Sequence, residues 1–413
     1  MSRSKTIVPL ILCTILFIAI FGGLVLANTR YAQNNPGEKD FLVPWLAART
    51  FLQYGNNPYD GPATQRAQII YYGRLANEGE DPLQLNIPFP IEIIYFPFAL
   101  ITNYALARGL WMTLLEVALV ALGFLSLKLT EWKPIRTPLP VVLIFSVVWV
   151  YGFLPLVAGK AVIYVALAVT GLLLALREQR DEFAGTLLVL PFFKPDIAGT
   201  FVLFILWWAI YHRRWRILGG FLMTLVIALA LGFFLLPEWF MPFLRGAISH
   251  INNNPGLTPG RIFGFWWPVV GPRLGWALSA LLLVILFIEW RNVRNKDFRH
   301  ILWTSCLTLA VTPLLGIPVV PPDEVVLFLP LILFLAILGE RWSRSGRWGI
   351  LGIALTTILL GIWLLTAELF LNSTVSVLND VLLLLLPILL MVGLYWMRWW
   401  AIRPPRTWSD SLP

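Results

Sequence analysis

The chain has 413 residues, of which 58% are hydrophobic and only 13% are charged, and its net charge is +9 at pH 7. This composition lies far outside the range of soluble globular proteins. Several apolar stretches approach the roughly 20 residues that a helix needs to cross a bilayer. The sequence therefore predicts an all-α polytopic membrane protein. Its excess of positive charge is expected to mark cytoplasmic loops, and nucleic acid is not expected as a partner.

The cysteines and histidines show no pattern of a cofactor site. Cys13 and Cys306 both lie in apolar segments and are far apart in the chain. The three histidines are His212, His250 and His300, and their spacing matches no metal-binding motif. We therefore expect no disulfide, no metal and no other cofactor.

The first apolar segment, residues 7–27, follows a basic N-terminus and is longer than the apolar core of a signal peptide. It is expected to be an uncleaved anchor with a cytoplasmic N-terminus. Apolar length predicts about twelve spans in all, with both termini and the tail 398–413 in the cytoplasm. The other predicted spans are 104–127, 139–157, 161–176, 183–193, 196–211, 217–236, 274–290, 301–315, 325–339, 348–366 and 381–397.

The basic residues support this topology, because most of them fall into predicted cytoplasmic segments. They are Arg3, Lys5, Lys128, Lys133, Arg136, Arg177, Arg180, Arg213, Arg214, Arg216, Arg291, Arg294, Lys296, Arg299, Arg341, Arg344, Arg347, Arg398, Arg403 and Arg406. The arrangement requires that residues 88–103 do not cross the membrane. Three prolines and Glu92 in that segment favour a helix along the outer surface. Residues 28–103 then form a large outer loop and residues 237–273 a second one, within a single membrane domain of residues 1–413.

The first outer loop contains a helical pattern that starts after Asp40 and ends at Gly55. Its apolar residues are Phe41, Trp45, Leu46, Ala48, Phe51 and Leu52. A helix this rich in Trp and Phe beside a span favours the membrane interface, which places the Asp40 carboxylate at the outer boundary. Two interpretations of Asp40 remain open, a helix N-cap and a catalytic carboxylate.

Lys194, Pro195 and Asp196 separate two apolar runs that are each too short to span comfortably. Two short helices that meet at Pro195 would form a hairpin whose tip lies beneath an outward cavity. A lysine at membrane depth is by default a hypothesis for a functional site. The alternative is a structural ion pair in which Glu116 neutralises Lys194 or Lys160, with Asp196 serving as a helix cap.

Several motifs together resemble glycosyltransferase family 87. These are polytopic enzymes of the C-type (GT-C) fold that include polyprenyl-phosphate-mannose-dependent α-mannosyltransferases. The similar features span roughly the first 220 residues. They are an acidic residue after the first span, an Ala-Ala helix, Gly-x-x-x-Tyr-Asp (Gly55, Tyr59, Asp60), the Pro-rich segment with Phe89, Pro90, Phe96 and Pro97, the Ala-Leu-Trp start of the next span at 105–111, and AG-x(8)-KP ending at Lys194 and Pro195.

The chain departs from that family at two places. The family usually has Gly-Gln at the outer end of the fourth span, and this chain has Gly159-Lys160. The family often has a histidine late in the chain, and Asp323 and Glu324 stand roughly in its place.

The resemblance implies a cell-envelope enzyme of the plasma membrane. It would transfer a hexose, expected to be mannose, from a polyprenyl-phosphate-sugar donor to a lipid or glycan acceptor at the outer face, with inversion. Such a reaction needs a base for the acceptor hydroxyl and a cation for the leaving phosphate. Asp40 is the candidate base, and Lys194, Arg261 and Lys160 are candidate phosphate ligands. The candidate substrate-binding residues are Asp60, Tyr59, Glu116, Asp196, His250, Asn253, Asp323 and Glu324.

Other interpretations of these residues stay open. Arg261, His250 and Asn253 lie among aromatic residues, which suit a sugar and its phosphate but are also typical of an interfacial belt. Asp323 and Glu324 could simply cap the next span. Three classes of protein therefore fit the sequence: a lipid-linked sugar transferase, a transporter or flippase, and a non-catalytic relative that binds a polyprenyl lipid.

Overall fold

The computed structural model describes residues 4–35, 39–78, 80–131, 139–253, 258–318, 320–341, 350, 352–353 and 376–402. All regular secondary structure in these ranges is helical, as predicted. The chain forms two compact units. The first unit comprises Met1–Ala118, Leu156–Ala161 and Leu231–His250, and the second comprises Leu119–Pro155, Val162–Ala230 and Ile251–Pro413.

Five described helical segments are long and apolar enough to cross a membrane, and a bent pair of helices could supply a sixth. The five lie in α1 (Ser4–Asn34), α6 (Tyr104–Thr130), α12 (Trp215–Leu235), α15 (Gly271–Asn292) and Pro321–Gly339. The bent pair is α7 (Leu139–Val148) with α8 (Val150–Ala158), at an angle of 55°. The chain is thus a multi-pass membrane protein. The predicted span 348–366 lies almost wholly outside the described residues.

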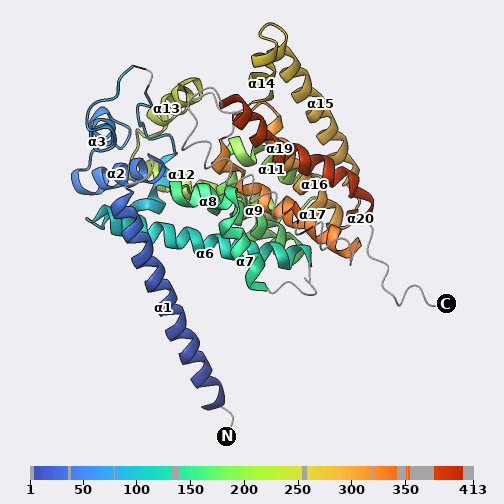
Figure 1. Cartoon of the computed structure of the whole chain (residues 1–413), viewed down its shortest axis with the longest axis horizontal. Coiled ribbons are helices and arrows are strands. Elements are labelled where there is room, and N and C mark those ends of the chain that lie inside the picture. The colour runs from blue at the N-terminus through green and yellow to red at the C-terminus, as the bar shows by residue number, and fades with distance from the viewer. Residues whose placement is uncertain are drawn as a thin grey trace, which may run out of the picture. The chain divides into compact units, whose positions relative to one another are not determined.

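Helix α1 joins the rest of the first unit only through its C-terminal turns (Figure 1). Most of its apolar side chains are exposed, as for Ile18 at 63%. Near its end, Asn28 donates a hydrogen bond to the Thr113 hydroxyl on α6 at 3.0 Å. A Cβ on Gly109 would lie 2.4 Å from Thr29 Oγ1, so the glycine permits the two helices to touch here. Small residues and interhelical hydrogen bonds of this kind are typical of helix packing in membranes.

Helix α2 (Lys39–Tyr54) forms the centre of the first unit. Phe41 and Ala48 are completely buried, and Trp45 is 6% exposed. The helix packs against α3 (Gly61–Tyr72), η1 (Ile93–Tyr95) and α5 (Phe96–Ala99). Neighbouring segments of the same loop thus cover this helix on several sides, and its predicted place at the membrane interface stays a prediction. Gly55 ends it with φ +65°, as predicted.

The segment that follows α3 is too short to span, as the sequence predicted. It consists of α4 (Phe89–Glu92), η1 and α5, a run of short helical pieces with prolines in the first turn of α4 and of α5. Phe89, Tyr95 and Ala99 are buried. The segment therefore packs on α2 with one side and exposes residues such as Ile94 and Pro97 on the other.

The second unit is a bundle centred on α9, α11, α16 and η3. Its described elements include α9 (Val162–Arg177), α10 (Asp181–Phe192), α11 (Pro195–Tyr211), α14 (Pro259–Trp266), α16 (Phe298–Val311), η2 (Thr312–Leu314), η3 (Pro321–Leu327), α17 (Phe328–Arg341), α19 (Ser376–Trp396) and α20 (Arg398–Ile402), in addition to parts of α6, α7, α8, α12 and α15. Ser305, Thr308 and Cys306 on α16 are fully buried, which shows that this helix lies in the interior.

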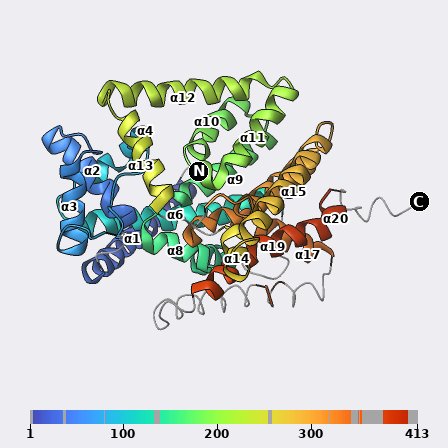
Figure 2. The same cartoon turned by 90° about the horizontal axis from the view of Figure 1, so that it is seen from above.

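Helices α10 and α11 form the predicted hairpin and lie side by side (Figure 2). Lys194 is the N-cap residue of α11, and Pro195 occupies its first position, where a missing N–H costs nothing. At the other end, the Arg214 guanidinium pairs with the Asp181 carboxylate at 3.3 Å. The ion pair closes the base of the hairpin, and Lys194 marks its tip.

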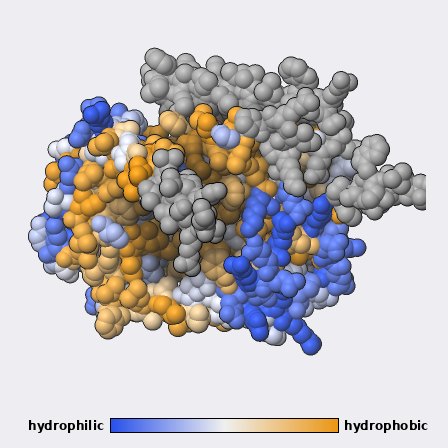
Figure 3. All heavy atoms as spheres, turned by 90° about the horizontal axis from the view of Figure 1, so that it is seen from below, coloured by the Kyte–Doolittle hydropathy of each residue, from blue (hydrophilic) through white to orange (hydrophobic). Residues whose placement is uncertain are grey.

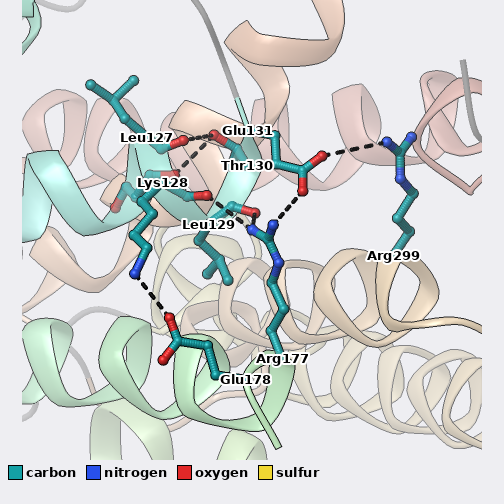
Figure 4. Close-up of polar contacts among 9 residues, drawn as sticks. Leu127, Lys128, Leu129, Thr130, Glu131, Arg177, Glu178 and Arg299 are labelled. Carbon is teal, nitrogen blue, oxygen red and sulfur yellow. Dashed lines mark hydrogen bonds and ion pairs between the residues drawn. The ribbon is translucent and has the colours of Figure 1, made fainter. Parts of the chain in front are cut away.

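One end of the second unit carries a cluster of ion pairs (Figure 4). Lys128 Nζ lies 2.9 Å from Glu178 Oε1, and this hydrogen bond lowers the pKa of Glu178. Arg177 and Arg299 pair with opposite oxygens of Glu131. The residues come from the regions around three connections, after α6, α9 and α15, which the sequence assigned to a single side of the membrane. On the face drawn in Figure 3, hydrophilic side chains also gather in one area beside a wide apolar area.

Candidate functional site

The first unit brings Asp40 and Lys160 together. Asp40 lies in the first turn of α2, where the helix dipole favours a negative charge, and Lys160 follows the end of α8. Lys160 Nζ is 3.9 Å from Asp40 Oδ2. The Asp40 side chain is 25% exposed and that of Lys160 is 17% exposed. The pair is therefore shielded on most sides but still reachable by a substrate.

Trp111 on α6 holds the neighbours of both residues. Its indole Nε1 donates to the Gly159 carbonyl at 2.8 Å, and its ring stacks on Phe41 with the ring centroids 5.7 Å apart. Gly159 has φ +76°, and a Cβ there would lie 2.8 Å from the Phe41 Cβ. Lys160 follows Gly159 and Asp40 precedes Phe41. The close approach of Gly159 to Phe41 therefore sets the distance between Lys160 and Asp40.

Arg108, about one turn before Trp111 on α6, binds the end of α8 and the end of α1. It is completely buried, and it donates to the carbonyls of Asn35 and Val157, the latter at 2.8 Å. These carbonyls lie at the C-terminal ends of α1 and α8, where the partial negative charge of a helix favours a cation. Our sequence analysis did not single out Arg108. Its signal was present, since an arginine in an apolar span requires buried partners.

Glu116 lies further along α6, and its side chain interacts with Asn28 on α1. Asn28 also donates to Thr113, so the three residues form a polar group between the two helices. Lys160, one of the two ion-pair partners suggested for Glu116, lies beside Asp40.

Tyr59 and Asp60, from the Gly-x-x-x-Tyr-Asp motif, have different surroundings. The Tyr59 hydroxyl donates to the Ile87 carbonyl at 2.7 Å, and burial, with a contribution from Glu92, raises its pKa. Asp60 is exposed at the N-cap position of α3. Glu92 itself is completely buried against Ala48 of α2, and burial raises its pKa far above the ordinary value.

The second unit gathers three further candidates around one small cavity of about 10 Å³. Asp196, Asp323 and Glu324 line it together with Thr312 and apolar residues. Asp323 and Glu324 are each 4% exposed. Both lie in the first turn of η3, so their position also fits a role at a helix N-terminus.

Lys194 adjoins this cavity through Asp196. Its Nζ is 3.9 Å from Asp196 Oδ2, and both side chains are about a third exposed, at 38% and 35%. The cavity lies at the start of α11, and the Arg214–Asp181 ion pair lies just beyond the other end of this helix.

The remaining candidates lie in the second outer loop. Arg261 is exposed on α14, and its backbone N–H donates to the Thr258 hydroxyl at 3.2 Å. His250 and Asn253 belong to the last turn of α13 (Phe240–Asn253), and their side chains are outside the described residues. Among the residues that the structure describes, no three His, Cys, Asp or Glu side chains are arranged to hold a metal ion.

These features define an all-helical, multi-pass membrane protein with lysine–aspartate pairs at the ends of its helices. Residues 88–318, more than half of the chain, match the model of glycosyltransferase family 87. The chain belongs to this family and is a glycosyltransferase. No curated protein and no solved structure matches it.

The matched segment differs from the region in which we noted the resemblance. It extends to residue 318, about 100 residues beyond the expected limit, and leaves out residues 28–87. Lys160, Lys194 and Arg261 therefore lie inside the match. Asp40 and Asp323, with Glu324, lie outside it.

Proposed function

We propose that this glycosyltransferase moves a hexose, mannose in the first instance, from a polyprenyl-phosphate donor to a lipid or glycan acceptor at the outer face of the plasma membrane. The observation that carries the proposal is the Asp40–Lys160 pair. Its charged atoms are 3.9 Å apart and partly exposed, and Trp111 and Arg108 hold the helix ends beside it. The pair places a proton acceptor next to a cation. A transfer from a phosphate leaving group needs both.

In this mechanism the acceptor hydroxyl attacks the anomeric carbon of the sugar. Asp40 takes the hydroxyl proton while the oxygen forms its bond to that carbon. The bond from the anomeric carbon to the phosphate oxygen breaks, and its electron pair stays on the phosphate. Lys160 is positioned to stabilise that negative charge. Lys194 and Arg261 belong to the second unit and are separate candidates for binding the phosphate of the donor. Because the hydroxyl attacks opposite the leaving group, the configuration at the anomeric carbon inverts.

Transfer assays with purified protein in lipid nanodiscs test the role of Asp40. With polyprenyl-phospho-mannose as donor, Asp40→Asn should lower the transfer rate by about 10² to 10⁴-fold, the usual effect of losing a general base. Donor binding and thermal stability should remain close to wild type. Glu78→Gln, an exposed carboxylate of the same outer loop, is the matched control and should transfer normally. Near-normal transfer by Asp40→Asn would remove Asp40 from the mechanism.

Lys194→Met tests the proposed phosphate ligand, because methionine keeps the length of the side chain without its charge. Donor affinity and transfer should both fall, whereas stability should change little. The Lys194–Asp196 pair is about a third exposed, and such pairs contribute only about 0–1 kcal/mol. A purely structural role predicts instead that Lys194→Met with Asp196→Asn regains full activity.

A further inference from the structure

The small cavity at the start of α11 has a charge pattern that restricts what it can bind. Carboxylates from Asp196, Asp323 and Glu324 face it, and Thr312 supplies a hydroxyl. The Thr312 hydroxyl is hydrogen-bonded to that of Thr200, so its position is fixed. All these groups belong to the second unit.

Glu324 has an oxygen whose hydrogen bonding is incomplete. Its side chain is more than nine-tenths buried, and the Tyr151 hydroxyl lies next to its carboxyl group. Its Oε2 atom is buried and makes no hydrogen bond. A buried carboxylate oxygen without a donor is unfavourable, and a ligand that donates a hydrogen bond would relieve that cost.

The chemistry of the cavity excludes several ligands. Three carboxylates repel a phosphate group. The described residues also provide no set of side chains arranged for a metal ion. A volume of about 10 Å³ admits one group the size of a water molecule. A neutral hydroxyl group meets all three conditions, because it is small, uncharged and able to donate to Glu324.

Asp196 connects this cavity to the proposed phosphate ligand. It lines the cavity, and its carboxylate also lies 3.9 Å from Lys194 Nζ. A phosphate at Lys194 and a hydroxyl in the cavity would therefore be separated by a single side chain. A hexose whose anomeric carbon carries the phosphate has its hydroxyl groups close to that phosphate, which suits this arrangement.

We propose that Glu324, with Asp196 and Thr312, binds one hydroxyl group of the hexose on the phosphate-linked donor. The inference rests on the proposed function, because it takes the phosphate to lie at Lys194. It assigns the recognition of the sugar to Glu324 and the recognition of the lipid phosphate to Lys194. Glu324 thereby determines whether a polyprenyl phosphate is recognised as loaded or as spent.

The test compares the binding of polyprenyl-phospho-mannose with that of polyprenyl phosphate lacking the sugar. Wild type should bind the loaded lipid more tightly. Glu324→Gln should weaken the binding of the loaded lipid by about tenfold, roughly the value of one hydrogen bond, and leave the binding of the bare lipid unchanged. The control is Glu289→Gln, a buried carboxylate of the same unit whose two oxygens already interact with Tyr395 and Arg398. It should keep the preference for the loaded lipid.

Several outcomes would overturn the inference. One is a Glu324→Gln variant that keeps the full preference for the loaded lipid, since the cavity would then hold only water. Another is an equal loss of affinity for the loaded and the bare lipid. If Glu324→Gln does not fold, Thr312→Val replaces it with the same expectation. Methyl α-mannopyranoside, which has no phosphate, should not compete with the loaded lipid for binding. Strong competition would indicate that the cavity binds a hydroxyl of the acceptor and not of the donor sugar.

The result can also be separated from the proposed transfer chemistry. A Glu324-dependent preference for the loaded lipid, together with normal transfer by Asp40→Asn, would leave the sugar site standing and reject the base. Absence of binding to either lipid by wild type would reject the donor class and the sugar site together.

Discussion

Replacing Gly159 by alanine probes the contact that sets the spacing of Asp40 and Lys160. The backbone at Gly159 has φ +76°, a left-handed conformation that costs a residue with a side chain about 1–2 kcal/mol. The new Cβ would also lie 2.8 Å from the Phe41 Cβ. Phe41 is completely buried and packs on Trp111 and Tyr95, so it has little room to move. Overpacking of this kind costs about 1–3 kcal/mol. The total loss of unfolding free energy should be about 2–5 kcal/mol.

Gly73→Ala provides the matched control for this substitution. Gly73 has φ +72°, nearly the same backbone conformation, but a Cβ there would meet nothing within 4 Å. Thermal unfolding in detergent should therefore show the backbone cost of about 1–2 kcal/mol for Gly73→Ala and a clearly larger loss for Gly159→Ala. Transfer activity at low temperature, where both variants are folded, should fall only for Gly159→Ala. Equal losses of stability and activity in the two variants would refute the argument that the Gly159–Phe41 contact positions the charged pair.

Three further predictions concern other parts of the chain. Burial raises the pKa of Glu92 above its ordinary value near 4.5, so the stability that Glu92 contributes is complete below about pH 4.5 and is lost as the pH rises toward the folded-state pKa. Glu92→Gln should flatten this decline of the melting temperature with pH and raise the stability at neutral pH. An unchanged pH dependence would contradict the argument. Trp111→Phe and Trp303→Phe each remove one buried hydrogen bond from an indole to a carbonyl, at 2.8 and 2.9 Å. Each should lower the free energy of unfolding by about 1–3 kcal/mol, the cost of the unpaired carbonyl, but only Trp111→Phe should lower the transfer rate. In a cysteine-free background, Asp60→Cys should react with a membrane-impermeant thiol reagent from outside and Arg180→Cys only from the cytoplasm, and the reverse pattern would invert the topology.

The local features of the fold could be predicted from the sequence. Apolar runs located most helices to within a few residues, because a span must satisfy its own backbone hydrogen bonds. The break at Lys194 followed from a charged residue and a proline between two short runs. The assignment of residues 88–103 as a non-spanning segment followed from its prolines. Each of these arguments depends on neighbours in the chain.

The arrangement of distant segments could not be predicted in this way. Apolar periodicity identified α2 as a helix, but it could not show that Phe89 and Tyr95 would cover it. The contact between Asp40 and Lys160 joins residues far apart in sequence, and it depends on the conformation of Gly159. The cavity at Glu324 likewise exists only because α11, η2 and η3 meet. Periodicity describes one helix at a time, and sites of this kind arise where several helices converge.

The limited contact of α1 with the rest of the first unit has a consequence for membrane insertion and assembly. The side chains from Thr14 to Ala27 are exposed or half-buried, so this stretch needs only hydrophobicity to insert into the membrane. The specific contacts described for this helix lie near its C-terminal end. Asn28 and Thr29 meet Thr113 and Gly109 on α6, and Arg108 of α6 binds the carbonyl of Asn35. A foreign apolar sequence could therefore replace residues 14–27 and still support assembly, whereas exchanging Asn28 and Thr29 for leucine should leave an inserted anchor that docks poorly on α6.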